Sequence, residues 1–231
     1  MRTVSGLARR VQRALGGRRP AAASGVARAL PGGRSLLTDV LGEQRRGGVR
    51  LDQADPTTCG SAVLVAMAAW ADPAESERLD GAVAGAGSGT GFGIRYDDRQ
   101  RRVHRETNRI WPRALGTTPW GMARWLRVNV PGAGPYRVRL VDDASPSDVE
   151  DVLAQVGVAL SAGHPVPLLV GSAVPRHYVL VLGPLGDGAG GWRVYEPTTG
   201  SVRVLDLALV RRRRLAPVLG FDRLHAVLLP G

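Results

Sequence analysis

Hydrophobic positions recur at a helical period in the first half of the chain and at strand-like spacing in the second half. The run from Cys59 to Ala71 is apolar almost throughout, which predicts a buried helix. Thr57 or Thr58 is its expected N-cap, and Asp72-Pro73 its expected end. Further helices are expected at 117–126 and 147–160, and strands at 136–141, 166–170, 177–182, 192–195, 202–205 and 224–229.

This order of elements predicts an α+β fold, in which helices precede a sheet of antiparallel strands. With 231 residues, 44% of them hydrophobic, the chain is long enough to form a packed core. Residues 35–44 predict a second short helix, with Ser35 as its cap. Residues 81–93 are rich in glycine but lack the G-x-G-x-x-G spacing of a dinucleotide site, so we expect a mobile loop there.

The N-terminal residues differ from the rest in charge. Residues 1–50 contain eleven Arg and only two acidic residues, a net charge of +9, whereas the whole chain carries +11. We therefore expect a basic, largely flexible N-terminal arm at 1–48 and a folded domain at 49–231. Within the arm, apolar side chains recur at helical spacing from Val4 to Leu15, with arginines on the other face. This spacing predicts a short basic amphipathic helix.

A basic amphipathic helix fits a membrane surface or an acidic partner, and the alternative is a solvated arm without a partner. The run Arg211–Arg214 likewise indicates a solvated face or a contact with an acidic partner. The chain has no recognised nucleic-acid motif and only 5% aromatic residues, so we predict no specific nucleic-acid binding. The pattern does not fix the oligomeric state.

Residue counts exclude several kinds of chemistry. All 31 basic residues are Arg, which excludes a Lys Schiff base and a phosphate-loop Lys. The single cysteine, Cys59, excludes an intramolecular disulfide and a cysteine-cluster zinc site. The four histidines have no metal-ligand spacing, so we expect neither metal nor cofactor. The absence of a long apolar segment and of a signal-like N-terminus predicts a cytoplasmic protein.

Cys59 is the centre of the predicted chemistry. Its position at the expected start of a buried helix favours a thiolate, because free backbone N–H groups and the helix dipole stabilise negative charge there. Gln53 lies across the Asp55-Pro56 turn, and its amide together with the Cys59 backbone N–H makes a two-donor oxyanion hole. The alternative for Cys59 is a buried structural thiol, and the alternative for Gln53 is a polar loop residue without a role in chemistry.

A thiolate nucleophile also needs a base. His177 opens one predicted strand and Glu196 ends the next, so antiparallel pairing brings them together and Glu196 orients the imidazole. The alternative for His177 is a surface histidine at a strand end, and the alternative for Glu196 is a solvated acid in a turn. The other histidines, His104, His164 and His225, are expected to be surface or turn residues.

Three blocks carry a resemblance to a known family: QADPTTCGSAVL (53–64), PVPLLVGSAVPRHYVLVLG (165–183) and YEPTTG (195–200). The chain resembles the papain-like cysteine peptidases, and within them the bacteriocin-processing peptidases of double-glycine type. TTPWGMARWL (117–126) is similar to a helix common in that group. Two positions depart from the family pattern: Glu196 replaces the usual Asp, and Ser61 stands where Pro is common.

The resemblance implies a papain-like fold, with the nucleophile helix packed on the C-terminal sheet. It also implies a thiol-dependent hydrolase of peptide or amide bonds with a Cys59–His177–Glu196 triad and a Gln53 oxyanion hole, acting on a peptide or protein substrate. Two alternatives stay open. One is an acyl transferase using the same thioester; the other is a catalytically silent binding module whose basic arm docks to an acidic partner.

Overall fold

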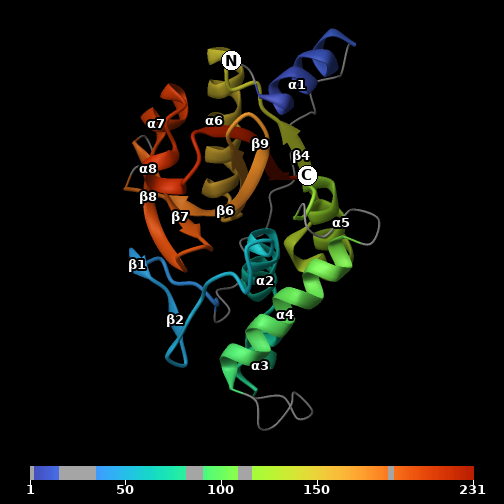
Figure 1. Ribbon diagram of the computed structural model, residues 1–231, viewed down its shortest axis with the longest axis vertical. Helices are drawn as coiled ribbons and strands as arrows, with labels where there is room; N and C mark the ends of the chain where they lie inside the picture. Colours follow the sequence, from blue (N-terminus) through green and yellow to red (C-terminus); the bar gives the residue numbers. More distant parts are fainter. Residues whose placement is uncertain (1–2, 16–34, 82–90, 109–115, 187–189) are drawn as a thin grey trace.

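The protein is described here by a computed structural model covering residues 3–15, 35–81, 91–108, 116–186 and 190–231 (Figure 1). The fold is mixed α+β, with helices on both sides of a seven-stranded antiparallel sheet. The elements are α1 (Val4–Ala14), β1 (Gly42–Glu43), β2 (Arg45–Arg46), β3 (Val49–Arg50), α2 (Cys59–Ala71), α3 (Pro73–Asp80), α4 (Phe92–Thr107), α5 (Pro119–Asn129), the 3-10 helix η2 (Pro131–Ala133), β4 (Tyr136–Leu140), α6 (Pro146–Ser161), β5 (Val166–Gly171), β6 (Pro175–Pro184), β7 (Gly191–Glu196), β8 (Ser201–Asp206), α7 (Leu207–Arg212), α8 (Ala216–Leu219) and β9 (Arg223–Pro230).

The sheet has the strand order β1-β8-β7-β6-β5-β9-β4, and all of its pairs are antiparallel. Successive side chains point to opposite faces. On β6, Tyr178 and Leu180 face the core around α2, whereas Val179 and Val181 face the core around α6. Strands β5 to β9 therefore each contribute to two cores, and Figure 1 shows α2, α4 and α5 grouped apart from α6, α7 and α8.

Helix α2 lies at the centre of the first core. All of its residues from Cys59 to Ala69 are buried, which confirms the prediction of a buried helix. Asp72 is its C-cap in an extended conformation before Pro73, as expected for a residue that precedes proline. Thr58 occupies the N-cap position, but its hydroxyl does not cap the helix, because it donates to the carbonyl of Asp55 instead.

The predicted strands and the helices at 117–126 and 147–160 are present, as β4 to β9, α5 and α6. The predicted helix at 35–44 is wrong. Gly42 has a φ of +108°, outside the helical region, and the Gln44 side chain holds the segment in an irregular path by accepting from the Thr38 N–H at 2.9 Å. Leu36 and Leu37 in this segment join the core around α2.

Helices α3 and α4 were not predicted. Helix α4 covers a strongly polar stretch, and its buried residues Phe92, Tyr96, Gln100, Val103 and His104 lie at helical spacing although only three of them are apolar. It begins inside the glycine-rich segment predicted as a loop; residues 82–90 of that segment lie outside the described residues.

The described structure also extends beyond Val49 towards the N-terminus. Strand β1 adds to the edge of the sheet by pairing with β8, and helix α1 packs beside β4 and β9. Residues 16–34 of the predicted arm lie outside the described residues. Among the helices that the structure describes, none is both long enough and apolar enough to cross a bilayer.

The turn after β7 generates a prediction. Gly200 has a φ of +59°, and a Cβ there would lie 3.0 Å from the Leu51 carbonyl, whereas Gly186 has a φ of +57° with open space around it. Gly186→Ala should cost about 1–2 kcal/mol of unfolding free energy from backbone strain alone. Gly200→Ala should cost clearly more, as measured by urea unfolding. Equal losses would show that the approach of Leu51 does not constrain this turn.

Candidate active site

Cys59 is the first residue of α2 and is only 5% exposed. The turn before it is held by Asp55, whose side chain accepts from the Thr57 N–H at 2.8 Å and whose carbonyl accepts from the Thr58 N–H at 3.1 Å. The side chain and the backbone carbonyl of Asp55 together fix the chain at the helix start. No described side chain caps this end of α2, so its first N–H groups face the surroundings of Cys59.

Gly60 allows the helix to approach the sheet closely. A Cβ at this position would lie 3.2 Å from a ring carbon of Tyr178 and 3.3 Å from Cβ of Thr117. Tyr178 is the neighbour of His177 on β6, so the contact at Gly60 sets the distance between the helix start and this strand. Any side chain at position 60 would crowd Tyr178 and Thr117, which explains why glycine follows Cys59 in the sequence.

His177 and Glu196 form a buried pair. His177 Nε2 lies 2.8 Å from Glu196 Oε1, and the two residues are 6% and 4% exposed. They belong to neighbouring antiparallel strands, with Glu196 at the end of β7 and His177 near the start of β6. The pair therefore forms although Glu196, one methylene longer, stands where the resembling family usually has Asp.

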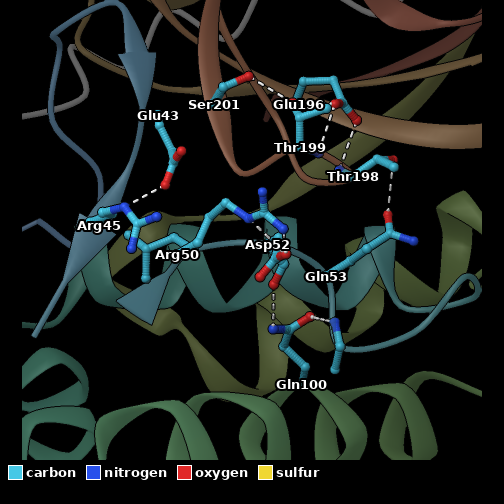
Figure 2. A network of polar contacts seen from close by, with 12 residues as sticks. Glu43, Arg45, Arg50, Asp52, Gln53, Gln100, Glu196, Thr198, Thr199 and Ser201 are labelled. Atoms are coloured by element: carbon cyan, nitrogen blue, oxygen red, sulfur yellow. Dashed lines mark hydrogen bonds and ion pairs between the residues drawn. The ribbon is translucent and has the colours of Figure 1, made fainter. Parts of the chain in front are cut away.

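The carboxylate of Glu196 is held by the turn that follows it. Its Oε1 accepts from the Thr198 N–H at 2.8 Å, and its Oε2 accepts from the Thr199 N–H at 3.0 Å and the Thr199 hydroxyl at 2.7 Å (Figure 2). Burial by itself raises the pKa of Glu196, but the hydrogen bonds from His177, Thr199 and Thr198 lower it to about 2. Glu196 is therefore ionised at neutral pH.

His177 interacts with both partners. Burial by itself lowers its pKa, but hydrogen bonds with Cys59 and Glu196 raise it to about 9. Since Nε2 is engaged by Glu196, Nδ1 is the ring nitrogen left for the thiol. The structure thus brings Cys59, His177 and Glu196 into one chain of contacts, with His177 in the middle and protonated at neutral pH.

Gln53 lies between the two turns of the site. Its backbone N–H donates to the Pro197 carbonyl at 2.8 Å, and its Nε2 donates to the Asp55 carbonyl at 2.9 Å. Its Oε1 accepts from the Thr198 hydroxyl at 3.3 Å (Figure 2). An amide nitrogen carries two hydrogens, so one donor of Gln53 is left beyond the bond to Asp55.

The sequence reasoning missed two supporting residues. Gln100 of α4 accepts from the Ala54 N–H and donates to the Asp52 carbonyl, both at 3.0 Å, and so clamps the segment that carries Gln53 (Figure 2). Gln100 lies in the polar stretch where no helix was predicted. Thr199 lies in the block YEPTTG, but no role was predicted for it. A threonine three residues after an acid can donate to that acid, and this spacing was the signal in the sequence.

The other histidines were expected at surface or turn positions, but all three are buried; His164 lies in the connection between α6 and β5, whereas for His104 in α4 and His225 in β9 the prediction is wrong. His104 contacts the amide of Asn108, and His164 packs against the ring of Trp70. His225 lies in β9 and contacts the hydroxyl of Ser5. The described residues contain no group of three acidic, histidine or cysteine side chains suited to hold a metal ion.

The ion pair predicts how stability depends on pH. The raised pKa of His177 means that its contribution is complete below about pH 6.5 and is lost as the pH rises through 9. The lowered pKa of Glu196 means that its contribution is complete above about pH 4.5 and is lost as the pH falls through 2. Urea unfolding should therefore give the pair's largest stabilisation between about pH 4.5 and 6.5.

Glu196→Gln should flatten the loss of stability between pH 6.5 and 9. Glu150→Gln is the matched control, because Glu150 pairs with Arg211 on the exposed surface. The control should keep the wild-type loss in that range. An unchanged alkaline loss in Glu196→Gln would contradict the role of Glu196 in raising the pKa of His177.

Comparison with known proteins leaves the site to be interpreted from its own geometry. Neither a scan of protein-family models nor a search of curated proteins gives a match to this chain. What can be stated of the chemistry therefore rests on the arrangement of Cys59, His177, Glu196 and Gln53, together with the sequence blocks that contain them.

Proposed function

We propose that the protein is a papain-like thiol hydrolase of peptide or amide bonds. The observation that carries this proposal is the chain of buried contacts from Cys59 through His177 to Glu196. A thiol at a helix start, a protonated imidazole beside it and an ionised carboxylate behind the imidazole are the parts that thiol acyl-transfer chemistry needs. The packing of α2 on an antiparallel sheet supports the papain-like arrangement.

In the proposed reaction, Cys59 Sγ attacks the substrate carbonyl carbon as a thiolate, and the carbonyl electron pair moves to oxygen. The second N–H of the Gln53 amide and the backbone N–H of Cys59 donate to this oxyanion. The tetrahedral centre collapses, the C–N bond breaks, and His177 gives its proton to the leaving amine. A thioester between Cys59 and the acyl group remains.

Water completes the cycle. His177, now neutral, takes a proton from the water molecule that adds to the thioester carbonyl. The C–S bond then breaks, the product leaves as a carboxylic acid, and the thiolate–imidazolium pair is restored. Glu196 keeps the imidazole in place throughout and stabilises its charged form, as its 2.8 Å contact with Nε2 allows.

Alkylation tests the activation of the thiol. Iodoacetamide should modify Cys59 at pH 6, and His177→Ala should slow that reaction about ten-fold or more, because the imidazolium stabilises the thiolate. Intact-protein mass spectrometry reports the reaction without ambiguity, since Cys59 is the only cysteine. His164→Ala is the matched control, a histidine that is similarly buried but packs against Trp70. Equal rates for wild type and His177→Ala would refute the activation.

Turnover tests Gln53. On a substrate found by screening peptide amides, Cys59→Ala should abolish turnover, and Gln53→Ala should lower kcat by about ten- to a thousand-fold with little change in KM. Gln53→Glu retains the acceptor that Thr198 uses but removes the N–H donors, so it should be at least as damaging. Gln53→Ala should hardly change the alkylation rate of Cys59, because the thiolate is stabilised by His177 and the helix start.

Two outcomes would contradict these assignments. If Gln53→Ala keeps full activity on a substrate that Cys59→Ala cannot turn over, the oxyanion is held by another donor. If Cys59→Ala turns the same substrate over at the wild-type rate, the thiol is not the nucleophile of the reaction.

A further inference from the structure

Helix α1 is attached to the domain by its polar face. Ser5 and Gly6 are buried against the sheet, where Ser5 Oγ lies 3.1 Å from His225 Nδ1 and the Val4 N–H donates to the Ala173 carbonyl at 3.1 Å. A Cβ at Gly6 would lie 3.1 Å from a carboxylate oxygen of Asp142, so the backbone of α1 approaches the domain closely here. This contact uses the face that an amphipathic helix on a protein surface normally turns to water.

Arginines strengthen this attachment. Arg13 Nη2 lies 2.8 Å and Arg9 Nε 3.6 Å from the buried carboxylate of Asp148, which also binds Arg139. Burial by itself raises the pKa of Asp148, but hydrogen bonds from Arg139 and the Asp142 N–H, with the charges of Arg139 and Arg13, hold it below the usual value. The polar side of α1 is therefore engaged along much of its length.

The opposite face of α1 is apolar and exposed. We call Val4, Leu7, Val11 and Leu15 the α1 stripe; their exposed fractions are 56%, 55%, 57% and 81%. At 100° per residue these four positions fall within a narrow sector opposite Ser5, Gly6, Arg9 and Arg13. The rule that surface helices bury their apolar face is thus reversed, and the stripe points away from the domain.

We propose that the α1 stripe docks the protein on an anionic lipid surface. Residues 1–15 contain four arginines and no acid, and the first fifty residues carry a net charge of +9, which complements anionic headgroups. Four aliphatic side chains supply far less than the about 800 Å² that each partner buries in a stable protein interface, so a second copy is a poor occupant. Among the described arginines of α1, Arg10 stays exposed near the border of this stripe, whereas Arg9 and Arg13 face Asp148. A shallow apolar stripe on a basic segment is what an interfacial helix uses to insert between headgroups.

The position of α1 is compatible with such docking. Figure 1 shows α1 at one end of the molecule, beside β4 and β9, whereas α2, α3 and α4 extend towards the other end. Arg10 is exposed on the same helix and lines a hollow of about 390 Å³ together with Arg13, Asp142 and Ser145. A membrane in contact with the α1 stripe would therefore meet the outer side of α1 and would not displace α2, which begins with Cys59.

Vesicle co-sedimentation of the full chain tests the proposal. The probes are vesicles of phosphatidylcholine alone and vesicles in which about one third of the lipid is phosphatidylglycerol. Wild type should bind the anionic vesicles, and the double variant Leu7→Gln/Val11→Gln should bind them at least about ten-fold more weakly. The matched control is Val128→Gln/Val158→Gln, two valines that are 67% and 70% exposed on α5 and α6. The control should bind as wild type does.

Three outcomes would overturn the proposal. The first is that wild type fails to bind anionic vesicles, and the second is that the stripe variant binds them as well as the control does. The third is a dimer in analytical ultracentrifugation that the stripe variant alone dissociates, since the stripe would then face a second copy. All substituted side chains are exposed, so the variants should unfold at the wild-type temperature.

Discussion

Helix α2 contains no charged side chain from Cys59 to Ala71, and this constraint governs the arrangement of the other elements. A helix that is apolar on every side has to be covered on every side, because each exposed apolar face costs free energy in water. The sheet covers one side of α2, helices α3, α4 and α5 cover another, and Leu36 and Leu37 close part of the remainder. The helix start is the part where small and polar residues replace bulky ones, and there the chain places Cys59.

Burying an ion pair next to a thiol requires many compensating donors. Glu196 has three donors from Thr198 and Thr199 besides His177, and this number of hydrogen bonds is why the carboxylate stays ionised although it is buried. The cation of His177 is in turn stabilised by Glu196 and by the interaction with Cys59. The pKa of His177 therefore depends on Cys59 and Glu196, and the pKa of Glu196 depends in turn on His177.

The sequence predicted the parts of the structure whose periodicity follows hydrophobicity. Strands β5, β6 and β9 are buried on both faces and read as apolar runs, and α2 is an uninterrupted apolar run. Helix α4 could not be found in this way, because Gln100 and His104 occupy buried positions that a hydrophobic pattern reads as solvent. The contact of His177 with Glu196 was predictable from strand order. The contribution of Gln100 was not, since it comes from a helix distant in sequence, whereas the only signal for Thr199 was its spacing of three residues from Glu196.

The hydrogen bond from the Tyr195 hydroxyl to the Leu51 carbonyl, at 2.6 Å, joins residues 144 positions apart. It ties the segment before Cys59 to the strand that carries Glu196, so both ends of this long loop must be in place before the site exists. Contacts of such sequence separation form late, because the entropy of closing the loop is lost before they contribute. During synthesis on the ribosome, Cys59 thus leaves the tunnel long before His177 and Glu196 do. The thiol therefore stays without its imidazole neighbour until most of the sheet has been made.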